Sequence, residues 1–117
     1  GLTVTQNVLT SLGGQSLQAI VAESDDMALG ALEALRSSGV SGVKVIGFDA
    51  IPEALKLVRS GEMAATVEQS PKAQAQTALR QLVARIRKQT PIAGASIAPL
   101  LITQSNINEA ERIGEIR

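Results

Sequence analysis

The chain has 117 residues, of which 11 are basic and 11 are acidic, so its formal net charge is zero. A neutral chain of this length fits one domain or less, and it has no general electrostatic attraction to nucleic acid or anionic lipid. It contains no His, Cys, Trp or Tyr, which removes the commonest general base, the thiol nucleophile and most transition-metal ligands. We therefore predict that the chain is not an enzyme, holds no metal or cofactor and does not bind nucleic acid.

The sequence has no membrane-spanning or targeting pattern. No stretch approaches the roughly 18 apolar residues that a membrane span needs, and no charged start leads into the apolar region of a secretion signal. We expect the chain to be soluble as written. This expectation leaves the compartment open, because a mature secreted protein or a fragment would have the same features.

The first predicted elements are a helix and a buried strand. Apolar residues recur through positions 2–12, and Gly13 and Gly14 then end the helical pattern. Residues 17–23 form an apolar run of the length typical of a strand buried in a parallel sheet.

The pattern after this strand predicts a second helix, which ends near Ser38. Asp25 and Asp26 are placed to accept hydrogen bonds from the free amides of its first turn and to favour its positive end. The side chains expected to face the core are Ala28, Ala31, Leu32 and Leu35.

A second unit repeats this plan. Residues 43–48 predict a strand and residues 49–52 a turn. The apolar positions after Pro52 predict a helix that stops at Gly61, and Pro52 suits a first helical turn because its missing amide has no partner there. A third strand is predicted over residues 64–68.

A long amphipathic helix follows, for which we predict Ser70 as the side-chain N-cap, with Pro71 after it. Four basic residues lie toward its end, as is typical of helix C-termini and solvated faces: Arg80, Arg85, Arg87 and Lys88. Five apolar residues recur at helical spacing and are called the apolar stripe: Ala75, Leu79, Leu82, Val83 and Ile86. After a loop at 90–94, residues 97–103 predict a final strand and residues 106–113 a short helix.

Strands that alternate with helices predict an α/β fold with a parallel sheet flanked by helices. Three strands end on a polar or acidic residue at equivalent points, namely Ser24, Asp49 and Gln69. Because such sheets bind ligands at the carboxyl ends of their strands, these side chains are candidate ligand contacts. The alternative is that each of them only caps the helix that follows.

An acidic pair after one strand and a lone Asp after another are also found in response-regulator receivers. Receivers are similar to each other in placing the pair on the first strand and the acceptor Asp on the third. Here Asp26 and Asp49 follow consecutive strands, and no Lys ends the later strand. A receiver or another enzymatic α/β domain is therefore the third reading.

Longer segments carry a more specific resemblance. AIVAESDDMALGALEALRSSG, VKVIGFDAIPEALKLVRSGEMAATVEQSP and LLITQSN occur in this order. The chain resembles the C-terminal part of type I periplasmic sugar-binding proteins of the ribose-binding kind, the solute-binding components of ABC importers. That family is related to the effector-binding domains of LacI-type repressors, which are the alternative.

The resemblance implies three ligand-binding residues. Asp49 stands where the family's Asp takes two adjacent sugar hydroxyls, and Gln69 stands where the chain crosses between two lobes. Ser24 stands where the family usually has an Asn or Asp that contacts the sugar. Because a serine hydroxyl is shorter and cannot bridge two hydroxyls, this departure makes a ligand other than ribose or an intervening water possible.

The resemblance also implies an incomplete two-lobed fold. Residues 1–70 match part of the C-terminal lobe, residues 71–96 are a crossover segment expected to pack on a missing N-terminal lobe, and residues 97–117 return as a strand and tail. The apolar stripe then lacks its native cover, so we expect it to dock on the missing lobe or on a second copy.

The function implied is binding of a monosaccharide between two lobes. Hinge closure around the sugar would then give a closed form that a membrane permease recognises. The location implied is the periplasm, or the cytoplasm for a repressor domain. The sequence does not identify the sugar, its anomer or the oligomeric state.

Overall fold

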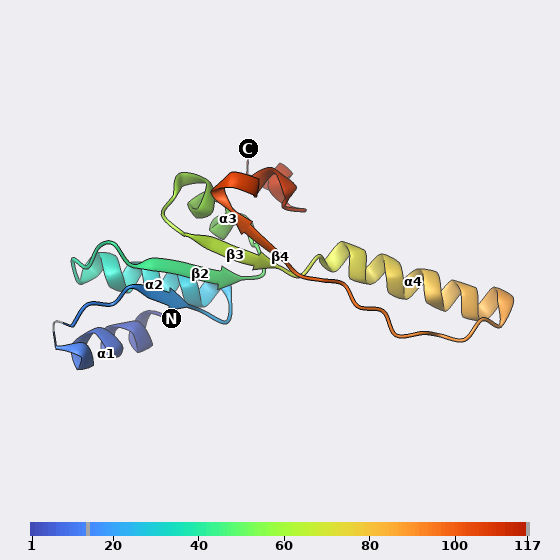
Figure 1. Ribbon diagram of the computed structural model, residues 1–117, viewed down its shortest axis with the longest axis horizontal. Helices are drawn as coiled ribbons and strands as arrows, with labels where there is room; N and C mark the ends of the chain where they lie inside the picture. The colour runs from blue at the N-terminus through green and yellow to red at the C-terminus, as the bar shows by residue number, and fades with distance from the viewer. Residues whose placement is uncertain (14, 117) are drawn as a thin grey trace.

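Four strands form one sheet in the computed structural model, which describes residues 1–13 and 15–116 (Figure 1). Their order across the sheet is the order of the chain: β1 (Ala19–Val21), β2 (Lys44–Phe48), β3 (Ala65–Glu68) and β4 (Leu100–Thr103). The first three are parallel, and β4 is antiparallel to β3. The predicted α/β class is confirmed, with one antiparallel strand added where the chain returns to the sheet.

Four helices occur where they are predicted: α1 (Leu2–Leu12), α2 (Asp25–Ser37), α3 (Pro52–Ser60) and α4 (Pro71–Lys88). Gly13 ends α1 and Gly61 ends α3, each in the left-handed conformation that glycine adopts without steric penalty. Gly14 lies outside the described residues. The terminal helix predicted over residues 106–113 is wrong in type, because two short 3-10 segments, η1 (Gln104–Glu109) and η2 (Ile113–Glu115), take its place.

The core lies between the sheet, helices α2 and α3 and the C-terminal 3-10 segments. It contains the four predicted α2 side chains, and its largest fully buried side chains include Leu55, Met63, Ile102 and Ile116. Helix α1 packs on α2 at close range (Figure 1). A Cβ added at Gly30 would lie 2.7 Å from the backbone nitrogen of Leu2, so only glycine permits this approach.

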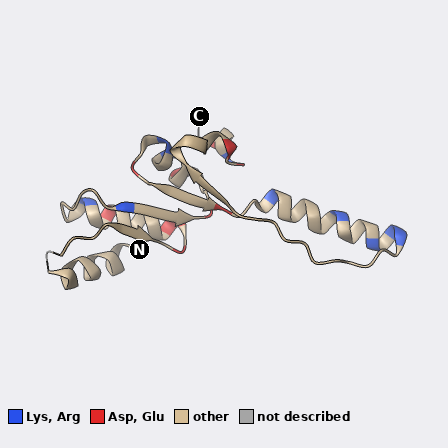
Figure 2. Ribbon diagram, in the orientation of Figure 1, with Lys and Arg blue, Asp and Glu red and all other residues tan. Residues whose placement is uncertain are grey.

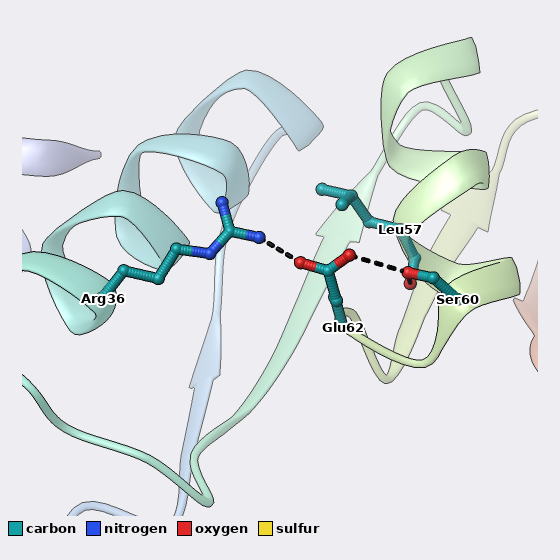
Figure 3. Close-up of polar contacts among 4 residues, drawn as sticks. All are labelled: Arg36, Leu57, Ser60 and Glu62. Carbon is teal, nitrogen blue, oxygen red and sulfur yellow. Dashed lines mark hydrogen bonds and ion pairs between the residues drawn. The ribbon is translucent and has the colours of Figure 1, made fainter.

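A polar cluster joins α2 to the turn after α3 at the amino ends of the strands (Figure 3). Arg36 in the last turn of α2 pairs with Glu62, and the Ser60 hydroxyl lies 3.0 Å from the second Glu62 oxygen. Both charged side chains are about half exposed, with relative accessibilities of 55% and 48%, so the pair contributes little stability. It ties together the ends of α2 and α3 that lie farthest from the candidate site.

Helix α4 and the extended segment that follows it project from the sheet as an arm, here defined as residues 71–99 (Figure 1). The arm gives the molecule its elongated extents of 63 × 31 × 18 Å. Of the described residues of α4, none is buried, and Leu79 and Ile86 of the apolar stripe are 60% and 69% exposed. The four basic residues toward the end of α4 are also exposed. Figure 2 shows blue segments toward the far end of this helix.

Candidate functional site

The carboxyl ends of β1, β2 and β3 meet at one edge of the sheet, because these strands are parallel and adjacent. This edge carries the three residues that the sequence singled out. The Gln69 side-chain amide donates a 2.7 Å hydrogen bond to Asp49 Oδ1. The structure therefore brings Asp49 and Gln69 together, whereas no hydrogen bond among the described residues joins Ser24 to either of them.

Ser24 serves as the N-cap of α2. Its backbone is extended, and its Oγ accepts a 3.2 Å hydrogen bond from the backbone nitrogen of Met27. The alternative that Ser24 caps the following helix is therefore confirmed. The prediction that Asp25 also accepts from the first-turn amides is wrong, because its carboxylate has other partners. Ser24 is half-buried, so its hydroxyl can still meet a ligand at the sheet edge.

Asp49 lies directly after β2 in an unusual backbone conformation. Its φ is 112° and that of Ala50 is 52°, both in the region that side-chain-bearing residues rarely adopt. Such residues each cost about 1 to 3 kcal/mol and persist only where the surroundings fix them. The Asp49 side chain is exposed, and its backbone nitrogen donates a 2.8 Å hydrogen bond to the Val67 carbonyl oxygen.

The surroundings that fix this loop centre on Asp25, which is fully buried. Asp25 Oδ2 accepts a 2.9 Å hydrogen bond from the backbone nitrogen of Ile51. Asp25 Oδ1 accepts a 2.7 Å hydrogen bond from the Thr66 hydroxyl, whose oxygen lies 3.2 Å from the donating backbone nitrogen of Ala50. One carboxylate thus links α2, the loop after β2, and β3.

Gly47 makes room for this carboxylate. A Cβ added there would lie 2.1 Å from Asp25 Oδ1, a distance that no side chain could tolerate without displacing the network. Sequence reasoning missed the role of Asp25, yet a glycine inside an otherwise apolar strand is a known sign that another group approaches the backbone closely. That signal was present in the run VIGFD.

Burial raises the pKa of Asp25, and the nearby negative charge of Asp49 raises it further. The hydrogen bonds from Thr66 and from the backbone of Ile51 and Phe48 oppose this shift, because they stabilise the ionised form. The buried carboxyl is therefore coupled electrostatically to the exposed one at the candidate site.

The third junction lies where the chain leaves the sheet for the arm. Ser70 stands at the N-cap position of α4, but its φ is 53° and its side chain makes no capping bond, so the predicted side-chain cap is wrong. The Gln74 side-chain amide instead donates a 2.6 Å hydrogen bond to the Gln69 carbonyl oxygen.

A second buried carboxylate, Glu68, anchors this crossing. Both of its oxygens accept hydrogen bonds from the backbone nitrogen of Glu111, at 3.0 and 3.2 Å, and Glu111 Oε2 lies 3.3 Å from the backbone nitrogen of Lys72. Burial raises the pKa of Glu68, the Glu111 amide opposes the shift, and the Glu111 charge adds to it. The C-terminal segment is thereby fixed to the root of the arm.

The edge suits a neutral ligand rich in hydroxyl groups. An exposed carboxylate, a side-chain amide and a hydroxyl together can accept and donate several hydrogen bonds. Within residues 1–13 and 15–116, no group of three His, Cys, Asp or Glu side chains could hold a metal ion. Over the same residues, no helix has the length and apolar character needed to cross a membrane.

The sheet and its flanking helices have the architecture of periplasmic binding proteins. Residues 1–90 match the family described as "Periplasmic binding protein domain", and the chain belongs to that family. The resemblance inferred from the sequence is therefore confirmed.

Individual relatives are sugar-binding proteins. The chain is 49% identical over 71 residues to the ribose import binding protein RbsB of Escherichia coli (strain K12). This alignment covers 61% of the present chain and 23% of RbsB. The chain is 41% identical over 83 residues to the D-allose-binding periplasmic protein of the same organism, covering 70% of this chain and 26% of that protein.

Solved structures of binding proteins are also similar to this chain. The Caulobacter myo-inositol binding protein bound to myo-inositol superposes with a TM-score of 0.90 and 54% sequence identity, covering 97% of this chain and 39% of that one. A periplasmic solute-binding protein of an ABC transporter from Actinobacillus succinogenes 130z, with bound D-allose, superposes with a TM-score of 0.83 and 33% sequence identity. The superposition covers 93% of the present chain and 38% of that protein. The chain thus spans under half the length of these proteins. These matches give no support to the repressor alternative.

Proposed function

We propose that this chain supplies one half of the binding site for a monosaccharide or a cyclic polyol in the solute-binding component of an ABC importer. The observation that carries the proposal is the Asp49–Gln69 pair at the carboxyl edge of the sheet, in a fold whose relatives bind ribose, allose and myo-inositol. No bond of the ligand is made or broken.

Asp49 is proposed to accept hydrogen bonds from two adjacent hydroxyls of the ligand. Hydrogen bonds to a charged group contribute roughly 1.5 to 3 kcal/mol each. Gln69 holds Asp49 Oδ1 through its amide nitrogen, which orients the carboxylate and leaves the Gln69 side-chain oxygen as a further acceptor. A ligand that lacks one of the two hydroxyls would lose one of these charge-assisted hydrogen bonds and should bind more weakly.

Ser24 is the third proposed contact. Its oxygen already accepts the Met27 amide, so its role toward a ligand is to donate the hydroxyl hydrogen. An Asn or Asp at this position would reach further and meet two groups. Ser24 therefore favours a ligand, or a bridging water, that presents an acceptor close to the start of α2.

The arm supports a two-lobed protein. We propose that residues 71–96 pack on a second lobe, which would cover the apolar stripe and supply the remaining ligand contacts. In the isolated chain the same stripe would favour association with a second copy. Ligand held between the lobes would favour a closed form, and a membrane permease on the periplasmic side would recognise that form.

The proposal is tested by calorimetry on the complete two-lobed protein, titrated with D-ribose, D-allose and myo-inositol. Replacement of Asp49 by alanine should weaken binding by about 2 to 4 kcal/mol, because charge-assisted hydrogen bonds are lost. The melting temperature of the ligand-free protein should change little, since the Asp49 side chain is exposed. Asp26→Ala, which removes a second exposed acid from the same edge, is the matched control and should bind normally.

Unaltered affinity in Asp49→Ala would remove this residue from the site. A wild-type protein that binds no pentose, hexose or inositol would refute the proposed function itself.

A further inference from the structure

Asp25 is the buried group that the proposed binding mode does not use. Its side chain is fully inaccessible, so it cannot contact a ligand. A buried carboxylate is expensive unless it is hydrogen-bonded, and this one has partners on both oxygens.

The partners of this network lie immediately beside Asp49. The backbone nitrogens of Ala50 and Ile51, the two residues that follow Asp49, are held by Thr66 Oγ1 and Asp25 Oδ2 at 3.2 and 2.9 Å. On the other side, the Asp49 nitrogen is held by the Val67 carbonyl oxygen at 2.8 Å. Three successive amides around Asp49 are therefore fixed.

The same segment contains the strained backbone. Asp49 and Ala50 both have positive φ, at 112° and 52°, and neither is a glycine. Without an external restraint these residues would relax toward negative φ, and the direction of the Asp49 side chain would change with them. The hydrogen bonds from Ala50 and Ile51 supply that restraint.

We propose that Asp25 and Thr66 are positioning residues, which hold the loop after β2 in its positive-φ conformation and so set the orientation of the Asp49 carboxylate toward the ligand. This inference rests on the proposed function for its consequence in binding. The restraint on Ala50 and Ile51 follows from the hydrogen bonds alone and does not depend on ligand binding.

The chemistry of the pair explains why these residue types are needed. A carboxylate offers acceptors on both sides. An asparagine in its place offers one acceptor oxygen and one donor nitrogen, so it keeps the Ile51 bond only with its nitrogen toward Thr66, whose hydroxyl must then accept instead of donate. The Thr66 hydroxyl donates to Asp25 and accepts from Ala50, a combination that serine preserves and valine abolishes. Because Gly47 has no side chain, the Asp25 carboxylate has room to reach both partners.

The first test is a double-mutant cycle on the complete protein, with myo-inositol and D-ribose as probes. Thr66→Val should weaken binding roughly 10- to 100-fold, and Thr66→Ser should restore most of the affinity. In an Asp49→Ala background, Thr66→Val should have no further effect, because the residue acts through Asp49. Thr3→Val, the same chemical change at an exposed position of α1, is the control.

A merely structural role for Thr66 predicts a different result. The effect of Thr66→Val on affinity would then add to that of Asp49→Ala. Additive effects, or wild-type affinity in Thr66→Val, would overturn the proposal. If Thr66→Val does not fold, Thr66→Ala, which also removes the hydroxyl, takes its place in the same cycle with the same criterion.

The second test needs no ligand. Amide hydrogen exchange measured by NMR on the complete protein should be at least about tenfold faster at Ala50 and Ile51 in Thr66→Val than in the wild type. The Ala22 amide, bonded to the Ile46 carbonyl oxygen within the sheet, should be unchanged. Unaltered exchange at Ala50 and Ile51 would refute the restraint. If the wild type binds neither probe while Thr66→Val shows the faster exchange, the binding function alone is refuted.

Discussion

The sheet edge around Asp25 and the arm of residues 71–99 use their side chains in opposite ways. At the edge, fully buried polar groups are joined by short hydrogen bonds across three elements. In α4, the large apolar residues of the stripe are exposed, and no described residue is buried.

The two regions therefore differ in how their buried and exposed groups stabilise the folded chain. Among the described residues, no buried side-chain nitrogen or oxygen lacks a hydrogen-bond partner, so the body of the fold satisfies its own polar groups. The arm does not bury its own apolar groups. We propose that the second lobe described above buries them.

The largest expected difference between the regions comes from deleting a leucine side chain in each. Leu55 is fully buried in the core, so Leu55→Ala should lower the free energy of unfolding of the chain by about 3 to 5 kcal/mol. Leu82 is 47% exposed, and Leu82→Ala should change the same quantity by less than about 0.5 kcal/mol. Urea denaturation of both variants measures this.

The comparison is sharpened in the complete two-lobed protein, where the proposed second lobe covers the arm. There Leu82→Ala should cost about 2 kcal/mol, because the side chain becomes buried. An equally small effect with and without that lobe would contradict the packing proposed for the arm.

A smaller difference is expected from adding one methyl group to a glycine in each region. In Gly47→Ala the new Cβ would meet Asp25 Oδ1 at 2.1 Å and Met63 Cε at 3.1 Å, and the free energy of unfolding should fall by about 2 to 3 kcal/mol. In Gly94→Ala on the arm the Cβ meets nothing within 4 Å, so stability should be unchanged or slightly raised. Thermal unfolding followed by circular dichroism compares the pair. Equal melting temperatures for the two variants would show that the Asp25 network is not tightly packed.

The smallest expected effect concerns Glu68, where body and arm join. Its pKa is raised in the folded protein by burial, whereas an unfolded glutamate has a pKa of about 4.3. The folded state therefore binds more protons between these two values, and the stability that the carboxyl contributes is greatest below about pH 4 and falls as pH rises through the folded pKa.

Glu68→Gln cannot titrate, so the stability of the wild type relative to this variant should decline as pH rises from about 4 to about 7. Melting temperatures across this range give the measurement, and Glu33→Gln on the exposed face of α2 controls for the loss of one charge. A relative stability that instead increases with pH would mean that the Glu68 pKa is lowered.

Much of the fold could be predicted from the sequence because its apolar periodicity is local. The four helices and the four strands are found where the pattern places them, and Pro52 and Gly61 bound α3 as expected. The first strand is shorter than the predicted run 17–23, since β1 pairs on one side only and with three residues of β2. Local pattern cannot reveal how many neighbours a strand has.

The candidate site was predictable in part. Parallel strands place Asp49 and Gln69 at one edge, and the structure adds that they are hydrogen-bonded. The task of Asp25 was not predictable from helix-capping rules, which assign an acid at this position to the helix that follows. Its partners Thr66 and Ile51 lie 41 and 26 residues away in sequence, so only the assembled sheet brings them to it.

The pairing of β3 with β4 has a mechanical consequence. Glu68 faces Leu100 in the last pair of the ladder, so the chain leaves the sheet and re-enters it at neighbouring positions (Figure 1). The arm is therefore joined to the sheet by two adjacent chain segments, so a displacement of the arm must change the backbone of both.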